Sequence, residues 1–183
     1  MKTNMIDLHI WSRVREGDYE AFEQLYDLFF DSLYAYGIKL CKNSDQVEDA
    51  IHDMFLDIWK YHDKLSETTS VKFYLFRSLR RKIHKNIKSD EKVSIFNKDV
   101  THVYEVEDQS FDTLIIQSEE KAEKSVLLKK NLASLSKRQY EAVMLKFYSN
   151  FSYKEIGSMM DMNEQSARNL IGRGLEKLKG LFS

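Results

Sequence analysis

The 183-residue sequence contains no proline, only six glycines and a single cysteine, Cys41. Proline and glycine are the residues that most often interrupt a helix or form a tight turn. Their scarcity therefore predicts an all-α protein built from long helices. A single cysteine excludes an internal disulfide and a CxxC metal site, and it fits a reducing compartment such as the cytoplasm.

Long apolar segments are also missing from the sequence. The stretch Met1–Arg15 is polar and charged throughout and lacks the apolar core of a signal peptide. No later apolar run approaches the length of a membrane span. We therefore expect a cytoplasmic protein with no membrane insertion.

Signatures of catalysis are absent as well. The sequence has no Gly-rich phosphate loop, no nucleophile elbow and no metalloprotease motif. His52 stands among aspartates, but their four-residue spacing along one exposed helix gives no closed ligand shell for a metal. We expect no catalytic residue, no metal site and no cofactor, so the chain is not expected to be an enzyme.

Apolar residues recur at helical spacing in four segments of the first half of the chain. The pattern predicts helices over residues 6–14, 19–41, 45–61 and 71–88, with Asp18 and Ser44 as N-caps and a polar loop over residues 63–70. The periodicity fades after residue 88, where acidic residues outnumber lysines. We therefore expect two small helical domains joined by an acidic linker, with bounds of 1–88 for the N-terminal domain, 89–118 for the linker and 119–183 for the C-terminal domain.

The C-terminal domain carries several helix start signals. A helix is expected over residues 119–134, and two capping boxes follow, Ser136 with Gln139 and Ser152 with Glu155. In a capping box the serine oxygen accepts a hydrogen bond from the backbone amide three residues later, and the Gln or Glu side chain at that position accepts one from the serine amide. Asn163 marks a further start, before a helix over residues 165–179.

These signals fit a helix-turn-helix. Gly157 suits the point where two helices approach closely, and Met162 suits an apolar plug at the corner. The last helix would then present polar side chains that can reach base edges and phosphates. An ordinary helical hairpin is the alternative on spacing alone, and Gly172 and Gly174 weigh against helix stability, since each costs roughly 1 kcal/mol in a helix interior.

The net charge of -1 is unevenly distributed along the chain. The segment 71–88 has no acidic residue but many basic ones, namely Lys72, Arg77, Arg80, Arg81, Lys82, Lys85 and Lys88. Phe73, Tyr74 and Phe76 lie near its start. Cations neutralise phosphates and aromatic rings stack on exposed bases, so this segment favours single-stranded or melting DNA over the alternative of a solvated helix face.

The preceding helix has the opposite charge. Asp45, Asp49, Asp53 and Asp57 are spaced by four, with Glu48 beside them. Like charges at this spacing repel by a few tenths of a kcal/mol per pair. The acidic stripe indicates a basic protein partner, and a merely solubilising face is the alternative.

The order of these segments resembles the extracytoplasmic-function sigma factors of bacterial RNA polymerase, within the sigma-70 family. The resemblance rests on AFEQLYDLFFDSLYAYGIKL, then DQVEDAIHDMFLDIWKY, then VKFYLFRSLRRKIHKNIK, then LSKRQYEAVMLKFYSNFSYKEIGSMMDMNEQSARNLIGRGLEKLK. It covers nearly everything outside the linker. It implies an initiation factor whose N-terminal domain, sigma region 2, binds core polymerase and opens the minus-ten element, while the C-terminal domain, sigma region 4, binds the minus-thirty-five element.

The resemblance also implies roles for particular residues. Docking on core polymerase falls to Asp49, Asp53, Phe55, Leu56 and Trp59. The loop from Lys64 to Ser70 is similar to one that captures a flipped minus-ten base, and contacts with this element fall to Lys64, Ser66, Arg77, Arg80, Arg81 and His84. Contacts with the minus-thirty-five element fall to Asn163, Gln165, Ser166, Arg168, Asn169 and Arg173.

The sequence departs from the family pattern at four positions. Ser136 replaces a usual proline, Asp161 replaces the turn glycine, and Leu170 and Leu175 stand where basic residues are common. Each lost phosphate contact weakens salt-dependent affinity, so we expect the isolated C-terminal domain to hold DNA only modestly.

Three functions follow from the sequence. The preferred one is promoter recognition and melting by a detachable polymerase subunit, with core RNA polymerase and promoter DNA as partners and, by family habit, an anti-sigma factor as inhibitor. One alternative is a stand-alone helix-turn-helix regulator that binds duplex DNA as a dimer. The other is a module that binds polymerase without opening DNA.

Overall fold

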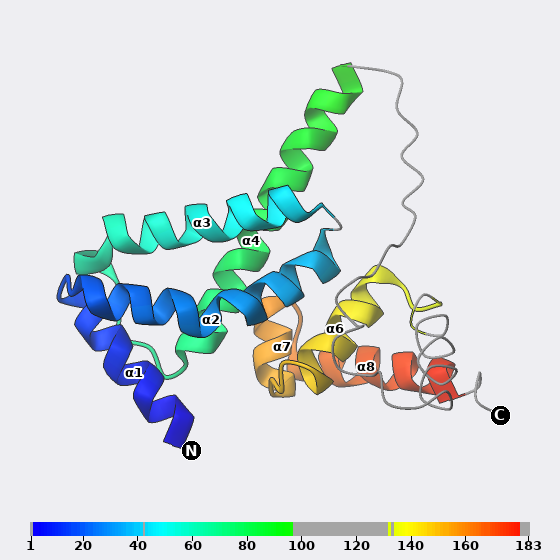
Figure 1. Ribbon diagram of the computed structural model, residues 1–183. Helices are drawn as coiled ribbons and strands as arrows, with labels where there is room; N and C mark the ends of the chain where they lie inside the picture. Colours follow the sequence, from blue (N-terminus) through cyan, green and yellow to red (C-terminus); the bar gives the residue numbers. More distant parts are fainter. Residues whose placement is uncertain (1, 42, 97–131, 133, 180–183) are drawn as a thin grey trace, which may run out of the picture. The chain divides into compact units, whose positions relative to one another are not determined.

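The protein is all-α in the part of the chain that the structure describes. The computed structural model describes residues 2–41, 43–96, 132 and 134–179, and within them it has seven α-helices, one short 3-10 helix and no strand (Figure 1). The chain divides into two compact units, Met1–Val106 and Glu107–Ser183. The prediction of an all-helical protein is confirmed, and each unit is described below by itself.

The first unit holds α1 (Lys2–Arg15), α2 (Tyr19–Leu40), α3 (Ser44–Lys60), the 3-10 helix η1 (His62–Lys64) and α4 (Val71–Phe96). Figure 1 shows α2 and α3 running side by side while α4 crosses both. Helix α4 ends eight residues later than the periodicity indicated. The reason is local, because the segment 71–96 contains neither glycine nor proline to stop it.

The N-caps of α2 and α3 are an aspartate and an asparagine side chain. The Asp18 carboxylate accepts from the amide of Ala21 at 3.1 Å, as predicted. For α3 the prediction was wrong by one residue: Asn43 is the cap, and its side chain accepts from the amide of Gln46 at 3.0 Å, whereas Ser44 is already helical. Both residue types cap well, so the pattern alone did not separate them.

The core of the first unit lies where α2, α3 and α4 meet. Its largest fully buried side chains are Leu25, Leu33, Ile51, Phe55, Leu75, Phe76, Leu79 and Ile83. Gly37 on α2 permits a close approach, because a Cβ there would lie 2.4 Å from Cγ1 of Val47 on α3. Sequence periodicity thus identified the core faces of these helices.

The second unit holds α6 (Lys137–Phe147), α7 (Tyr153–Met159) and α8 (Glu164–Lys179). The helix expected over residues 119–134 lies almost entirely outside the described residues. Both predicted capping boxes are present with both of their hydrogen bonds. Asn163 caps α8, since its side-chain oxygen accepts from the amide of Ser166 at 2.7 Å.

The α7–α8 turn has the geometry of a helix-turn-helix corner. A Cβ on Gly157 would lie 2.7 Å from the carbonyl oxygen of Met162, so only glycine fits there. Asp161 occupies the left-handed position with φ 55, where glycine is otherwise favoured. Met162 is only half-buried, and the methionines that fill the corner are Met159 and Met160, which are 2% and 1% exposed.

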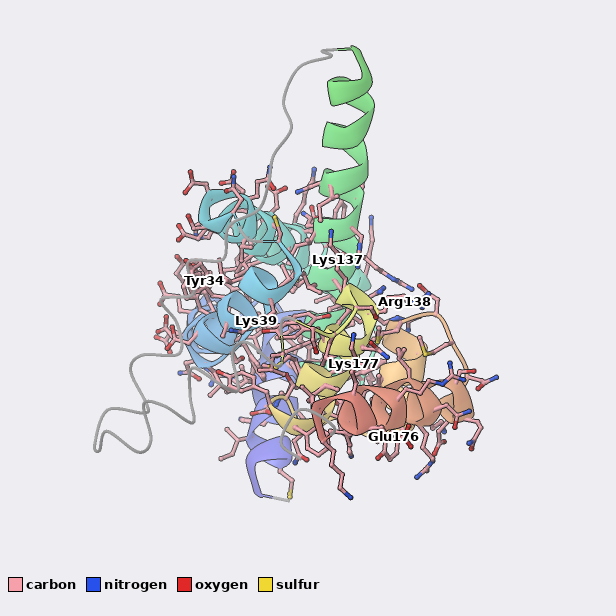
Figure 2. The ribbon with its side chains drawn as sticks, turned by 90° about the vertical axis from the view of Figure 1, so that its right-hand side faces the viewer. Tyr34, Lys39, Lys137, Arg138, Glu176 and Lys177 are labelled. Carbon is pink, nitrogen blue, oxygen red and sulfur yellow. The ribbon has the colours of Figure 1, made fainter. Side chains whose placement is uncertain are left out.

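One basic side chain of α6 closes this corner. The Arg138 guanidinium donates to the carbonyl of Met160 at 3.0 Å, at the C-terminal end of α7. Figure 2 labels the Arg138 side chain. The last carbonyls of a helix have no partner within the helix. Arg138 therefore stabilises the end of α7 just before the turn into α8.

Candidate nucleic-acid interface

Helix α3 presents acidic and apolar side chains to solvent. Asp49 and Asp53 are exposed, and Leu56 is 64% exposed. The acidic stripe is partly neutralised within the unit, because Nζ of Lys82 on α4 lies 2.8 Å from Asp57 and 3.5 Å from Asp53. The exposed face of α3 therefore combines carboxylates with one apolar side chain.

Phe55 and Trp59 of α3 pack against aromatic side chains of α2 and so hold α3 in place. Phe55 is 2% exposed and contacts two rings of α2, with centroids 6.0 Å from Phe22 and 4.9 Å from Tyr26. Trp59 is half-buried, and its ring centroid lies 5.1 Å from that of Phe22 and 5.5 Å from that of Tyr19. The buried Phe55 can therefore act on a docking partner only through the shape of α3.

The basic residues of α4 divide between two sides of the helix. Arg77, Arg80, Arg81 and His84 share one face, as their three- and four-residue spacing requires. Arg81 is exposed and the other three are half-buried. Lys82 lies on another side and pairs with α3, so it is not available to DNA without breaking that pair.

The aromatic residues beside this basic face contribute less than the sequence suggested. Phe76 is 1% exposed and packs against Tyr36 with ring centroids 5.0 Å apart, so it cannot stack on a base. Tyr74 packs against Trp11 of α1 at 4.9 Å, and burial raises the pKa of its phenol. Phe73 is half-buried, with the Arg77 guanidinium over its ring at 5.9 Å.

The loop between α3 and α4 carries two predicted minus-ten residues, Lys64 and Ser66, and both are exposed. Its backbone is ordered by several hydrogen bonds. Within the loop, the amide of Leu65 donates to the carbonyl of His62 at 3.2 Å, and the Ser70 amide donates to Oγ1 of Thr68 at 3.2 Å. The loop therefore has a defined conformation from which its exposed side chains project.

Helix α1 also holds this loop, through two residues that the sequence analysis missed. The Trp11 indole N–H donates to the carbonyl of Ser66 at 3.2 Å, and Nε–H of Arg15 donates to the carbonyl of Leu65 at 2.8 Å. A partly apolar helix face gave no local signal for these contacts. A third link joins His62 Nδ1 and the carbonyl of Arg15, which are 3.2 Å apart, next to Gly17 with φ +85.

The predicted minus-thirty-five residues all lie exposed on α8 or at its N-cap. Several of them bond to each other, since Gln165 donates to Asn169 at 3.0 Å and Arg168 lies 3.4 Å from Glu164. Each pair is separated by one helical turn. A contact of these groups with a base or phosphate, as the sequence predicts, would require them to give up these partners.

Tyr153 organises two cations beside the recognition helix α8, and sequence analysis did not single it out. Its ring lies 4.3 Å from the guanidinium carbon of Arg168 on α8 and 4.7 Å from Nζ of Lys146 on α6. Cation–π attraction holds both charges against one ring. Two helices thus place positive charge together at the predicted DNA surface.

Two leucines mark the family positions that often carry a basic residue. Leu170 is half-buried and Leu175 is 39% exposed. Neither offers a phosphate contact, because a leucine side chain has no charge and no hydrogen-bond donor. The two glycines of α8 differ from one another. A Cβ on Gly174 would lie 3.3 Å from Val143 on α6, whereas one on Gly172 would meet nothing within 4 Å. Close packing against α6 therefore explains why glycine occupies position 174, and the structure gives no such explanation for Gly172.

The fold and these surfaces define a helical transcription factor, whose first unit carries separate acidic and basic helices and whose second unit carries a helix-turn-helix. No described helix is both long and apolar enough to span a membrane. Two family models match the chain: "Sigma-70 region 2" over residues 25–93 and "Sigma-70, region 4" over residues 126–178. Together they span about two thirds of the chain.

The chain belongs to the sigma-70 family and is a sigma factor of the extracytoplasmic-function type. It is 19% identical over 163 residues to the ECF RNA polymerase sigma factor SigM of Bacillus subtilis (strain 168), covering 89% of this chain and 96% of that one. As a sigma factor it binds core RNA polymerase, recognises promoter DNA and initiates transcription. The stand-alone regulator considered from the sequence is therefore rejected. Sigma factors as a family are non-catalytic initiation factors.

Two solved structures share the fold. The sigma factor RpoE in complex with the anti-sigma factor NepR from Bartonella quintana has a TM-score of 0.66 and 23% identity, covering 88% of this chain and 96% of that one. CnrH in complex with the cytosolic domain of CnrY has a TM-score of 0.65 and 17% identity, covering 96% of both chains. These likenesses confirm the helical architecture of the chain.

Proposed function

We propose that three surfaces divide the work of initiation. The exposed face of α3, with Asp49, Asp53 and Leu56, docks on core polymerase, and Phe55 and Trp59 hold its shape. The loop with Lys64 and Ser66 and the basic face of α4 act on the minus-ten element through Arg77, Arg80, Arg81 and His84. The α8 surface reads the minus-thirty-five element through Asn163, Gln165, Ser166, Arg168, Asn169 and Arg173.

One observation carries this proposal: a single compact unit places an acidic, leucine-bearing helix and a basic helix next to each other, with Lys82 joining them. Such a unit suits two different partners, a basic protein surface and a nucleic acid. The domains that we propose are residues 1–88 and 119–183 with a linker over 89–118. The two family regions, 25–93 and 126–178, support two separate domains. Helix α4 and the first family region both continue past residue 88, to residues 96 and 93.

We further propose that an anti-sigma factor holds the protein inactive in the cytoplasm by covering its polymerase- or DNA-binding surfaces, and that the protein itself catalyses no reaction. The support is that RpoE and CnrH, which share the fold, were solved in complex with NepR and with the cytosolic domain of CnrY. Exposed apolar side chains such as Leu28 and Leu56, which are 48% and 64% exposed, suit burial under such a partner.

The test is a reconstitution of the full chain with core polymerase and promoter DNA, followed by permanganate footprinting of melted thymines and a transcription assay. Arg80→Ala with Arg81→Ala should impair opening while polymerase affinity stays normal. Asp53→Lys should weaken polymerase binding, because it reverses a charge on the proposed docking face. Asp31→Lys, a charge reversal at an exposed position on α2, serves as the matched control.

The outcomes separate the alternatives. A wild-type chain that forms no complex with core polymerase would refute the proposal. A complex that forms but never melts DNA would favour a module that binds polymerase without opening promoters. If the arginine variant lost polymerase binding and the aspartate variant lost opening alone, the two surfaces would be assigned in the wrong order.

A further inference from the structure

The loop between α3 and α4 is held by side chains that lie far away in the sequence. Trp11 and Ser66 are 55 residues apart, and Arg15 and Leu65 are 50 apart. The two side chains donate to the carbonyls of consecutive residues, at 3.2 Å and 2.8 Å. Two adjacent peptide units of the loop are thereby fixed to α1.

Both donors are themselves well anchored. Trp11 is 2% exposed and its ring packs against Tyr74 of α4, with centroids 4.9 Å apart. Arg15 also lies 3.5 Å from the carboxylate of Glu67 in the loop, and its carbonyl lies 3.2 Å from Nδ1 of His62. The contact is therefore a framework of several bonds between α1 and the loop, and not a single surface pair.

This framework leaves the recognition side chains of the loop available. The carbonyls of Leu65 and Ser66 are engaged by α1, whereas the side chains of Lys64 and Ser66 are exposed. Reading a base that has left the helical stack depends on short-range hydrogen bonds to its edge. A loop already held in one conformation loses less entropy when it binds, and it discriminates more sharply between bases.

We propose that Trp11 and Arg15 are positioning residues for base selection at the minus-ten element. They set the conformation of the loop from behind and do not contact DNA. This inference rests on the proposed role of the loop. It adds α1 to the machinery of promoter specificity, although α1 carries none of the predicted DNA-binding residues.

Three substitutions remove or restore the donors with little change in packing. Trp11→Phe removes the indole N–H but keeps a ring against Tyr74. Arg15→Met removes the donor and keeps an unbranched side chain, and Arg15→Lys restores a cation that can donate to the Leu65 carbonyl. Arg13→Met is the matched control, because Arg13 lies on the same helix but pairs with Asp18 at 2.7 Å, at the start of α2.

The probe is a promoter duplex selected by the wild-type holoenzyme from a pool randomised at the minus-ten element, together with its single-base variants. Permanganate reactivity gives the amount of open complex on each duplex, and the ratio between selected and substituted bases measures discrimination. Hydrogen–deuterium exchange of residues 61–70 in the full chain reports on loop order. Core polymerase affinity is measured in parallel.

We expect Trp11→Phe and Arg15→Met to lower the discrimination ratio by roughly threefold to tenfold, the range to which one net hydrogen bond converts. Exchange in the loop should become faster, while polymerase affinity stays unchanged. Arg15→Lys should recover part of the ratio, and Arg13→Met should leave it at the wild-type value.

Two results would overturn the inference, and they differ from failure of the proposed function. If wild type opens the promoter and both variants discriminate as well as it does, α1 has no positioning role, even if loop exchange rises. If Arg13→Met lowers the ratio equally, the effect is one of general stability. A wild-type holoenzyme that opens no duplex from the pool refutes the proposed function itself, and the inference falls with it.

Discussion

Gly157→Ala should destabilise the second unit, because the new methyl group would meet backbone. Its Cβ would lie 2.7 Å from the carbonyl oxygen of Met162, 3.2 Å from the carbonyl carbon of Asn163 and 3.3 Å from the Asn163 oxygen. Backbone atoms of a tight turn cannot rotate away as a side chain can. The α7–α8 turn must therefore shift, and α8 must shift with it.

The size of the effect follows from two opposing contributions. Overpacking costs about 1–3 kcal/mol. Alanine in place of glycine in a helix returns about 0.5–1 kcal/mol. From the middle of both ranges the net loss is roughly 1 kcal/mol, and for a domain of this size each kcal/mol shifts Tm by roughly 4–8 °C. Gly172→Ala is the matched control, since nothing lies within 4 Å of its Cβ and only the helical gain remains.

The two tryptophans make the assay selective. Trp11 and Trp59 are the only tryptophans of the chain, and both lie in the first unit. Their fluorescence reports unfolding of that unit, while circular dichroism reports both. Gly157→Ala should lower the Tm of the second unit measured by circular dichroism and leave the Tm measured by tryptophan fluorescence unchanged. Binding of the holoenzyme to the minus-thirty-five element should weaken, and Gly172→Ala should raise stability by about 0.5–1 kcal/mol.

The reasoning would be refuted if Gly157→Ala were as stable as wild type or more stable. It would also be refuted if Gly172→Ala were as destabilising as Gly157→Ala, because open space and backbone contact would then be equivalent. A matching shift in both transitions would show that the units unfold together. In that case the energies would apply to the whole chain.

Two further predictions concern charged side chains and the groups that hold them. Tyr153→Leu removes the ring that holds Lys146 and Arg168. Holoenzyme affinity for a minus-thirty-five duplex should then fall by roughly twofold to fivefold, because an exposed cation–π contact contributes about 0.5–1 kcal/mol. Tyr153→Phe keeps the ring and should match wild type. Asp18→Ala should lower the stability of the first unit at neutral pH. Hydrogen bonds from the Ala21 amide and the Arg13 side chain hold the pKa of Asp18 below its usual range, so its ionised form stabilises the folded state above the unfolded pKa. That stability is lost as the pH falls through the folded pKa, and the difference from wild type should shrink there.

Both predictions have clear contrary results. Equal losses for Tyr153→Phe and Tyr153→Leu would place the effect on the phenol hydroxyl and not on the ring. For Asp18, fluorescence-detected urea unfolding at several pH values gives the comparison, with Asp31→Ala on the exposed face of α2 as the control. A stability difference that stayed constant down to acidic pH would show that the carboxylate charge is not responsible.

The sequence by itself determined the features that depend on neighbours within a few residues. The capping boxes at Ser136 and Ser152 and the cap at Asp18 were all predicted, because a cap joins residues only three positions apart. Helical periodicity likewise identified the core faces and the helix-turn-helix at Gly157. The predicted assignments of individual side chains to polymerase and DNA remain proposals.

Tertiary structure decided the features that join distant segments. It buried Phe55 and Phe76, paired Lys82 with Asp53 and Asp57, and brought Trp11 and Arg15 to the carbonyls of the α3–α4 loop. Periodicity places a residue on a face of its own helix, but it does not say which helix or loop lies opposite. That choice follows from how α1, α3 and α4 pack, because a hydrogen bond across 50 residues exists only once the helices are in place.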